Sequence, residues 1–199
     1  MSNLELLSPF VLVAYTMWAT PGPNNMMLVY SGANFGFKRT LPHLLGIILG
    51  TCILNFVAVL GLKPLIDKWP ILMLGLKITG SIWLVLIGWK MAHASNSQAA
   101  REQSKPMRFI AAALFQFANP KAITATLALV SLVLVAIETN ANLLWVIMLI
   151  IPPLSFISII PWVLAGQGIR RFLSTELRWK LFTRGTGALT ASCALFLWI

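Results

Sequence analysis

Long apolar runs constrain this chain more than any other feature of its sequence. Several of them reach or exceed roughly 18 residues, the length at which a helix becomes able to cross a lipid bilayer. Only 10% of the residues are charged, whereas soluble domains carry about 25%. The sequence therefore predicts an all-α polytopic membrane protein that forms a single transmembrane domain over residues 1–199.

Six membrane-spanning helices fit the distribution of apolar residues. We expect them at Leu4–Ala33, Leu41–Leu62, Pro70–Ala92, Phe109–Ile137, Leu143–Gly166 and Leu181–Ile199. The segment 93–108 after the third span contains a polar stretch whose composition is typical of a flexible linker. This linker divides the chain into two three-helix halves, 1–92 and 109–199.

Lys and Arg are concentrated in alternate loops. Eleven of them lie in the loops after the first, third and fifth spans, and only Lys63 and Lys68 lie in loops on the opposite side. Because cytoplasmic loops carry an excess of Lys and Arg, we expect these three loops inside the cell and both termini in the periplasm. Topology and contact with lipid headgroups explain the net charge of +10, so no nucleic-acid partner is expected.

Two predicted spans are interrupted by proline, and each is the first helix of its half. The interruptions carry Thr20, Pro21, Gly22, Pro23, Asn24 and Asn25 in the first span, and Asn119, Pro120 and Lys121 in the fourth. Each break lies ten residues from the basic side, or about 15 Å, near the middle of a hydrocarbon core of roughly 30 Å. Interrupted helices in matching positions of two halves point to the binding site of a transporter.

Local chemistry predicts how each break is built. A residue before proline avoids helical geometry, so the first half-helix should end at Thr20. Pro23 suits the first position of a new helix, and in the second break Asn119 suits the N-cap and Pro120 the first helical position. Two helix N-termini beside Lys121 would form an anion-binding site. The alternative explanation of the prolines is a packing kink, which is common in membrane helices.

Two titratable side chains within the spans have competing explanations. Lys121 lies too close to the predicted middle of the membrane for its ammonium to snorkel to the interface, which favours a role in the site. His43 lies near the start of the second span, beside Pro42. It could be a buried neutral histidine or a proton-coupling residue.

Carboxylates are missing from the predicted middle of the membrane. The acids lie near span ends or in loops, at Glu5, Asp67, Glu102, Glu138 and Glu176. A divalent-metal site would lack ligands, a strongly cationic substrate would lack a counter-charge, and no motif of a catalytic site or a cofactor is present. We therefore expect no enzyme and no cofactor, but a site for a carboxylate, with amide and backbone oxygens to hold an ammonium.

Glycines occur in pairs at four-residue spacing. Gly32 and Gly36 form one GxxxG motif and Gly46 and Gly50 another. Such motifs allow close helix contacts. The contacts could lie within the fold or between the protomers of a homodimer.

The chain resembles the LysE/RhtB family of amino-acid exporters. The resemblance covers nearly the whole chain and rests on TPGPNN (20–25), GFKRTLPHLLGIILG (36–50), KITGSIWLVLIGWK (77–90) and FQFANPKA (115–122). It implies export of amino acids or their derivatives across a bacterial inner membrane, driven by the proton motive force. It also implies that the PGPN and NPK motifs bind substrate. Trp83 stands where the family often has tyrosine.

Other classes of membrane protein compete with an exporter. In a non-transporting scaffold or assembly factor the prolines would serve packing alone, and substitution of Lys121 would leave flux unchanged. A channel is a further alternative, but a charged site in mid-membrane fits a carrier better.

Overall fold

The computed structural model describes residues 3–62, 68, 70–94 and 105–195. Regular structure within these residues is helical throughout. The elements are α1 (Asn3–Ala19), α2 (Pro23–Val57), a π-helical turn η1 (Ala58–Leu62), α4 (Pro70–Ala92), α6 (Phe109–Ala118), α7 (Pro120–Thr139), α8 (Leu143–Ile169), a 3-10 turn η2 (Arg170–Phe172) and α9 (Glu176–Ser192). Most of the predicted linker, at 95–104, and the end of the sixth predicted span, at 196–199, lie outside the described residues.

Both predicted breaks are present. The first helix ends at Ala19, one residue before the predicted Thr20, and α2 begins at Pro23. The second break is the single residue Asn119, whose extended backbone separates α6 from α7. The rules for proline and for helix caps therefore located both breaks correctly.

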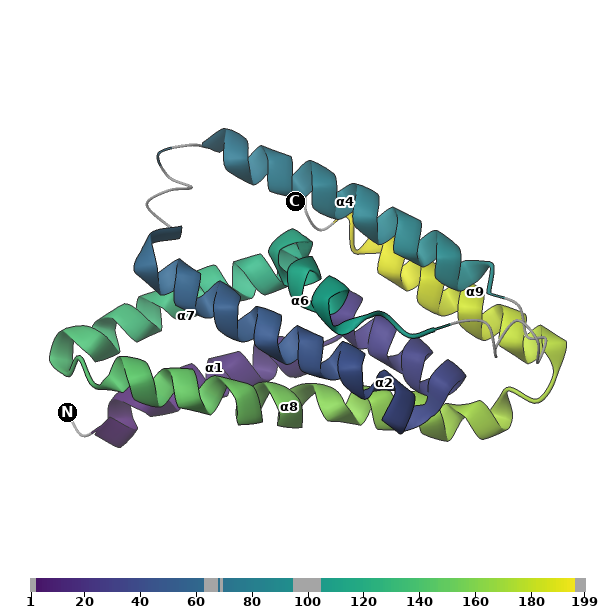
Figure 1. The fold of residues 1–199 in the computed structure, drawn as a ribbon, viewed down its shortest axis with the longest axis horizontal. Helices are drawn as coiled ribbons and strands as arrows, with labels where there is room; N and C mark the ends of the chain where they lie inside the picture. The colour runs from purple at the N-terminus through teal and green to yellow at the C-terminus, as the bar shows by residue number, and fades with distance from the viewer. Residues whose placement is uncertain (1–2, 63–67, 69, 95–104, 196–199) are drawn as a thin grey trace.

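Helix α2 folds back on itself at Gly36. This residue has φ 74° and ψ 174°, a backbone region that is essentially restricted to glycine. The hydroxyls of Ser31 and Thr40 lie 2.9 Å apart, although nine residues of straight helix would span about 13 Å. The connection expected between the first two spans is thus a tight turn, and α2 has two antiparallel arms (Figure 1).

Glycines, which have no side chain, allow the two arms of α2 to pack closely against two other helices. A Cβ built on Gly46 or Gly50 would collide with the carbonyl oxygens of Phe109 and Ala113 in α6. This GxxxG motif therefore forms a contact within the fold, which was one of the two expected uses.

The other predicted motif behaves differently at its two glycines. Gly32 lies against the backbone of Val163 in α8, and Gly166 of α8 lies in turn against Val29. Gly36 has no neighbour within 4 Å of the position of a Cβ. Gly36 therefore makes no helix contact within the described part of the fold, and the positive φ of the chain reversal explains why glycine stands there. A contact between protomers stays a prediction.

A second close pair joins the C-terminal helix to the rest of the bundle. Figure 1 shows α4 and α9 side by side along one edge, opposite the edge formed by α8. A Cβ on Gly88 would lie 2.5 Å from the carbonyl oxygen of Gly187, and a Cβ on Gly187 would lie 2.5 Å from the carbonyl oxygen of Gly88. The backbones of α4 and α9 are therefore in direct contact.

Apolar surface covers most of the helices. Three of the described helices are long and apolar enough to cross a membrane, namely Pro23–Gly61, Pro120–Thr139 and Leu143–Phe172, and shorter apolar helices are Ile78–Ala92 and Phe109–Ala118. The first of them contains the reversal within α2, so its length is divided between two arms. The number of spans and their division into two halves stay a prediction.

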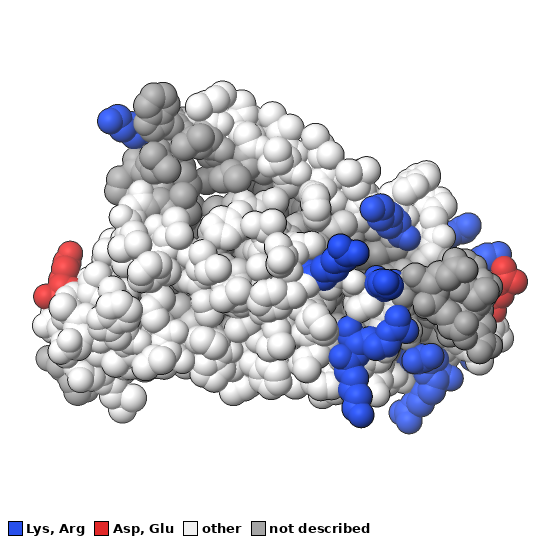
Figure 2. All heavy atoms as spheres, in the orientation of Figure 1, with Lys and Arg blue, Asp and Glu red and all other residues white. Residues whose placement is uncertain are grey.

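Basic side chains gather at one end of the molecule. On the face in Figure 2 most Lys and Arg lie at the end where α4 finishes and α9 begins in Figure 1. The remainder of that face is almost entirely uncharged. The fold thus has one basic end, next to long apolar sides.

Candidate functional site

The two breaks meet in space. The ammonium of Lys121, at the start of α7, donates hydrogen bonds to the carbonyl oxygens of Thr20 and Pro21, the latter at 3.1 Å. These residues are separated by about 100 positions in the chain. Tertiary structure therefore joins the two motifs that sequence spacing placed in corresponding helices.

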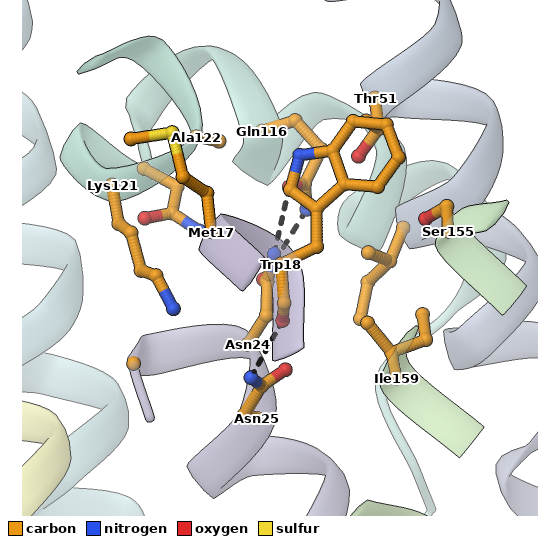
Figure 3. A pocket seen from close by; sticks show the side chains of 13 residues that line it. Met17, Trp18, Asn24, Asn25, Thr51, Gln116, Lys121, Ala122, Ser155 and Ile159 are labelled. Atoms are coloured by element: carbon orange, nitrogen blue, oxygen red, sulfur yellow. Dashed lines mark hydrogen bonds between the residues drawn. The ribbon is translucent and has the colours of Figure 1, made fainter. Parts of the chain in front are cut away.

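All eight residues of the predicted substrate site line two adjoining pockets that share Gly22 and Lys121. The break pocket contains Gly22, Asn24, Asn25, Asn119 and Lys121 together with residues of α1, α6 and α8. The outer pocket contains Pro21, Gly22, Pro23, Pro120 and Lys121. Figure 3 shows side chains from α1, α2, α6, α7 and α8 converging around the break pocket.

The pockets differ in size. The outer pocket measures about 290 Å³ and the break pocket about 30 Å³. A cavity of the smaller size holds about two water molecules. The break pocket therefore leaves little free space between its polar groups, and a larger ligand requires the surrounding helices to move apart.

The carbonyl groups of residues 18–21, at the end of α1 and just beyond it, accept hydrogen bonds from side chains of other helices. Asn25 donates to the carbonyl oxygens of Trp18 and Thr20, at 3.0 and 2.6 Å, and the indole of Trp162 donates to Ala19 at 3.1 Å. Lys121 completes the set. A helix end leaves carbonyl groups without intrahelical partners, so these contacts satisfy groups that would otherwise be unpaired in an apolar bundle.

The Lys121 side chain has one set of partners that the sequence did not predict. The sequence placed its ammonium at two helix N-termini, and the ammonium does lie beside Gly22, the N-cap of α2. It also lies at the C-terminal end of α1. A cation is unfavourable at the N-terminus of its own helix and favourable at the negative end of another, which explains this orientation.

Two helix N-termini do open toward the pockets. In α2 the first hydrogen bond of the i to i−4 type is donated by the Met26 N–H to the carbonyl oxygen of Gly22, at 2.9 Å. In α7 the first such bond is donated by the Ile123 N–H to the carbonyl oxygen of Asn119, at 3.0 Å. The amide groups that precede Met26 and Ile123 therefore lack acceptors within their own helices. Together with the nearby ammonium they form a region suited to an anion.

Gln116 is a polar residue of this site that sequence reasoning missed. Its fully buried side chain exchanges hydrogen bonds with Asn24, at 2.8 and 3.3 Å, and so joins α6 to α2. A lone amide one turn before Asn119 in an apolar helix was a signal that could have identified it. Thr51 and Ser155 also line the break pocket, but their spacing gives no comparable signal.

Asn119 carries an unused acceptor. Its side chain is 1% exposed, and its Oδ1 has no hydrogen-bond partner among the described residues. As the N-cap of α7 it makes no capping bond through its side chain. A buried acceptor without a partner is costly, so a ligand with an N–H group would be stabilised there.

The structure does not bring His43 into either pocket. His43 lies in a separate cavity further along α2. No group of three or more metal-ligating side chains occurs in the described part of the chain. Whether His43 takes part in proton coupling stays a prediction.

Comparisons with known proteins identify the family of the chain. A family model described as LysE type translocator matches residues 15–199. The chain is 27% identical to the leucine efflux protein of Klebsiella pneumoniae over 165 residues, covering 78% of this chain and 76% of that protein. It is 24% identical to the cysteine/O-acetylserine efflux protein of the same organism over 193 residues, covering 96% and 95%. No solved structure matches the chain. Since the family model extends over nearly the whole length, the chain belongs to the LysE type translocators, a family of transporters and not of enzymes.

Proposed function

We propose that the protein exports small neutral or zwitterionic amino acids, or their derivatives, across a bacterial inner membrane, driven by the proton motive force. The observation that carries this proposal is the convergence of two interrupted helices on one polar site with a lysine. Broken helices of this kind form the substrate sites of secondary transporters. The names of the relatives, which are efflux proteins for leucine and for cysteine or O-acetylserine, support the substrate class.

The polar groups suit the two ends of an amino acid. The carboxylate would accept hydrogen bonds from the free amide groups at the starts of α2 and α7 and from Lys121. The ammonium would donate to Asn119 Oδ1, and the amides of Asn24 and Gln116 lie close enough to contribute further oxygens. No carboxylate lines either pocket among the described residues, so a second positive charge on the substrate would have no partner.

Binding requires a change of conformation. The break pocket is too small for an amino acid, and Lys121 is already bound to two carbonyl groups. When the site opens, the substrate carboxylate would replace one of these carbonyls as a partner of the ammonium. A transporter that alternates between closed and open states around one site behaves in this way.

The membrane orientation is part of the proposal. The basic end of the fold would lie in the cytoplasm and both termini in the periplasm, as the positive-inside rule predicts. Export would then carry the substrate from the basic end past the breaks.

Measurement of released amino acids tests the function. Cells that over-express the protein should accumulate at least one zwitterionic amino acid in the medium, compared with cells that carry an empty vector. Lysine or arginine as the fastest substrate, with matched intracellular pools, would contradict the preference for neutral species. An unchanged medium across the whole amino-acid panel would favour a non-transporting scaffold.

A further inference from the structure

A larger cavity lies next to the break pocket. It measures about 490 Å³ and shares two helices with the break pocket, because both arms of α2 and helix α6 contribute residues to each space. Asn25 of the break pocket is followed by Ser31 of the cavity, Ile47 is preceded by His43, and Gln116 is preceded by Ala111. The cavity, which we call the basic cavity, thus extends from the breaks toward the end of the molecule where Lys and Arg gather.

Apolar side chains separate the two spaces. Met27, one turn beyond Asn24, lines the basic cavity and forms a buried cluster with Leu84 and Phe115. The ring of Phe115 stacks on Trp83, with centroids 6.3 Å apart, and Trp83 also lines the cavity. A ligand in the basic cavity would therefore have to displace this cluster to reach the breaks.

The mouth of the basic cavity is positively charged. Lys90, Lys105 and Arg108 line it, and no ion pair of theirs occurs among the described residues. The first backward hydrogen bond of α6 runs from the Ala112 N–H to the Arg108 oxygen at 2.9 Å, so the preceding amide groups lack helical acceptors. Three cations and a helix N-terminus favour an anion at this point.

A buried histidine without partners lies in the wall of the basic cavity. His43 is 2% exposed, and neither ring nitrogen has a hydrogen-bond partner among the described residues. Leaving a buried polar group unpaired is costly. A ligand that offers a hydrogen-bonding group to the imidazole would recover part of that cost once the neighbouring side chains move, because both nitrogens are buried in this structure. The remaining wall is apolar, with Met27, Ile87 and Met91.

We propose that the basic cavity is a loading site that binds an amino acid on the cytoplasmic side before it moves to the break pocket. The cations hold the carboxylate, the imidazole of His43 hydrogen-bonds to the polar end of the molecule, and the apolar wall contacts its side chain. This assignment rests on the proposed function, since it takes the exported amino acid as the ligand and the basic end as cytoplasmic.

Uptake into inside-out membrane vesicles tests the loading site, because it exposes the cytoplasmic face to a known amino-acid concentration. The double variant Lys90→Gln/Arg108→Gln should raise the KM for leucine about five- to tenfold, as expected from the loss of two partly exposed ionic contacts, and leave the maximal rate unchanged. The control Lys38→Gln/Arg184→Gln removes the same charge from exposed residues outside the cavity and should leave KM within about twofold. An equal increase in both double variants overturns the loading site.

Cysteine protection tests binding without transport. After both native cysteines, Cys52 and Cys193, are replaced by serine, Ile87→Cys places one thiol in the wall of the cavity. Leucine or another member of a panel of thiol-free zwitterionic amino acids should slow its reaction with a charged maleimide in nanodiscs of zwitterionic lipid. Protection by none of these amino acids, or protection by anionic lipid alone, overturns the proposal. If wild-type vesicles take up no amino acid, the proposed function fails, whereas the labelling result still decides whether the cavity binds one.

Discussion

At the scale of single residues, Lys121 links the two halves of the chain. It lies in the first turn of α7, but its ammonium binds the carbonyl groups of Thr20 and Pro21, which directly follow α1. The contact closes the breaks over a pocket that has room for little more than water. Opening of the site therefore requires the ammonium to leave these carbonyls or to exchange one of them for the substrate.

Substitution of this lysine should separate insertion from transport. Lys121→Ala removes a charge that costs about 2.5–3.5 kcal/mol in mid-bilayer on insertion scales, so membrane levels should remain near normal. A charge-assisted hydrogen bond in such a site contributes roughly 1.5–3 kcal/mol, which corresponds to about ten- to hundredfold in export. The measurement is export per unit of membrane protein.

Two further variants make this comparison specific. Lys121→Arg should not fully restore export, because a broad planar guanidinium differs from a compact ammonium. The exposed Lys38→Ala should retain it. Normal flux from Lys121→Ala would show that the lysine acts in packing alone.

Gly22 keeps space for the lysine. A Cβ at this position would lie 2.5 Å from Lys121 Cδ and 3.1 Å from Nζ. The backbone of Gly22 is extended, with φ 179°, so alanine should fit the chain and displace only the lysine. We expect Gly22→Ala to reduce export about as strongly as Lys121→Ala, by roughly tenfold or more, with a melting temperature in detergent close to that of Lys121→Ala, because both changes remove the same contacts. Gly168→Ala, at a position with open space, is the control, and full activity of Gly22→Ala would refute this steric role.

At the scale of helices, the reversal of α2 depends on one backbone conformation. Gly36→Ala places a side chain at φ 74° and ψ 174°, which costs about 1–3 kcal/mol. The melting temperature in detergent should fall and the yield of folded protein should decrease. Gly75→Ala changes an uncrowded glycine within α4 and should be neutral or slightly stabilising. Equal stability of both variants would argue against strain at the turn.

The breaks could be predicted because their causes are local. Proline removes an amide donor and restricts its neighbour, so Pro23 and Pro120 mark helix starts wherever the helices pack. Their meeting could be anticipated only from the similarity of the two halves. Helix ends were less certain, since α9 begins at Glu176 and not at the predicted Leu181.

Other features could not be predicted because they depend on contacts between distant segments. The Asn24–Gln116 pair exists only once α2 and α6 are packed together. The direction of the Lys121 side chain depends on carbonyl groups at the end of α1. The sequence of α7 alone gives no information about them. Gly32 and Gly36 have the same spacing as Gly46 and Gly50, yet only the structure distinguishes a turn glycine from a packing glycine.

At the scale of the whole molecule, the uneven distribution of charge predicts the topology. Reporter fusions in the linker, between residues 95 and 105, and at the C-terminus should report opposite sides of the membrane, because the positive-inside rule assigns this loop, with its basic residues, to the cytoplasm. Alkaline phosphatase should be active at the C-terminus and a cytoplasmic fluorescent reporter in the linker. Signals from the same side would exclude the six-span arrangement.

The glycine contact between α4 and α9 has a mechanical consequence. Two backbones that touch at Gly88 and Gly187 cannot slide past one another without collision. We therefore expect α4 and α9 to move as one rigid unit relative to the rest of the bundle. Spin labels on the exposed Ile82 and Leu189 should keep their separation when substrate is added, whereas labels on Ile82 and Leu114 should change theirs. A constant distance between the labels on Ile82 and Leu114 would mean that the α4–α9 unit does not move during transport. If it moves, the basic cavity beside α4 would widen or narrow with each cycle.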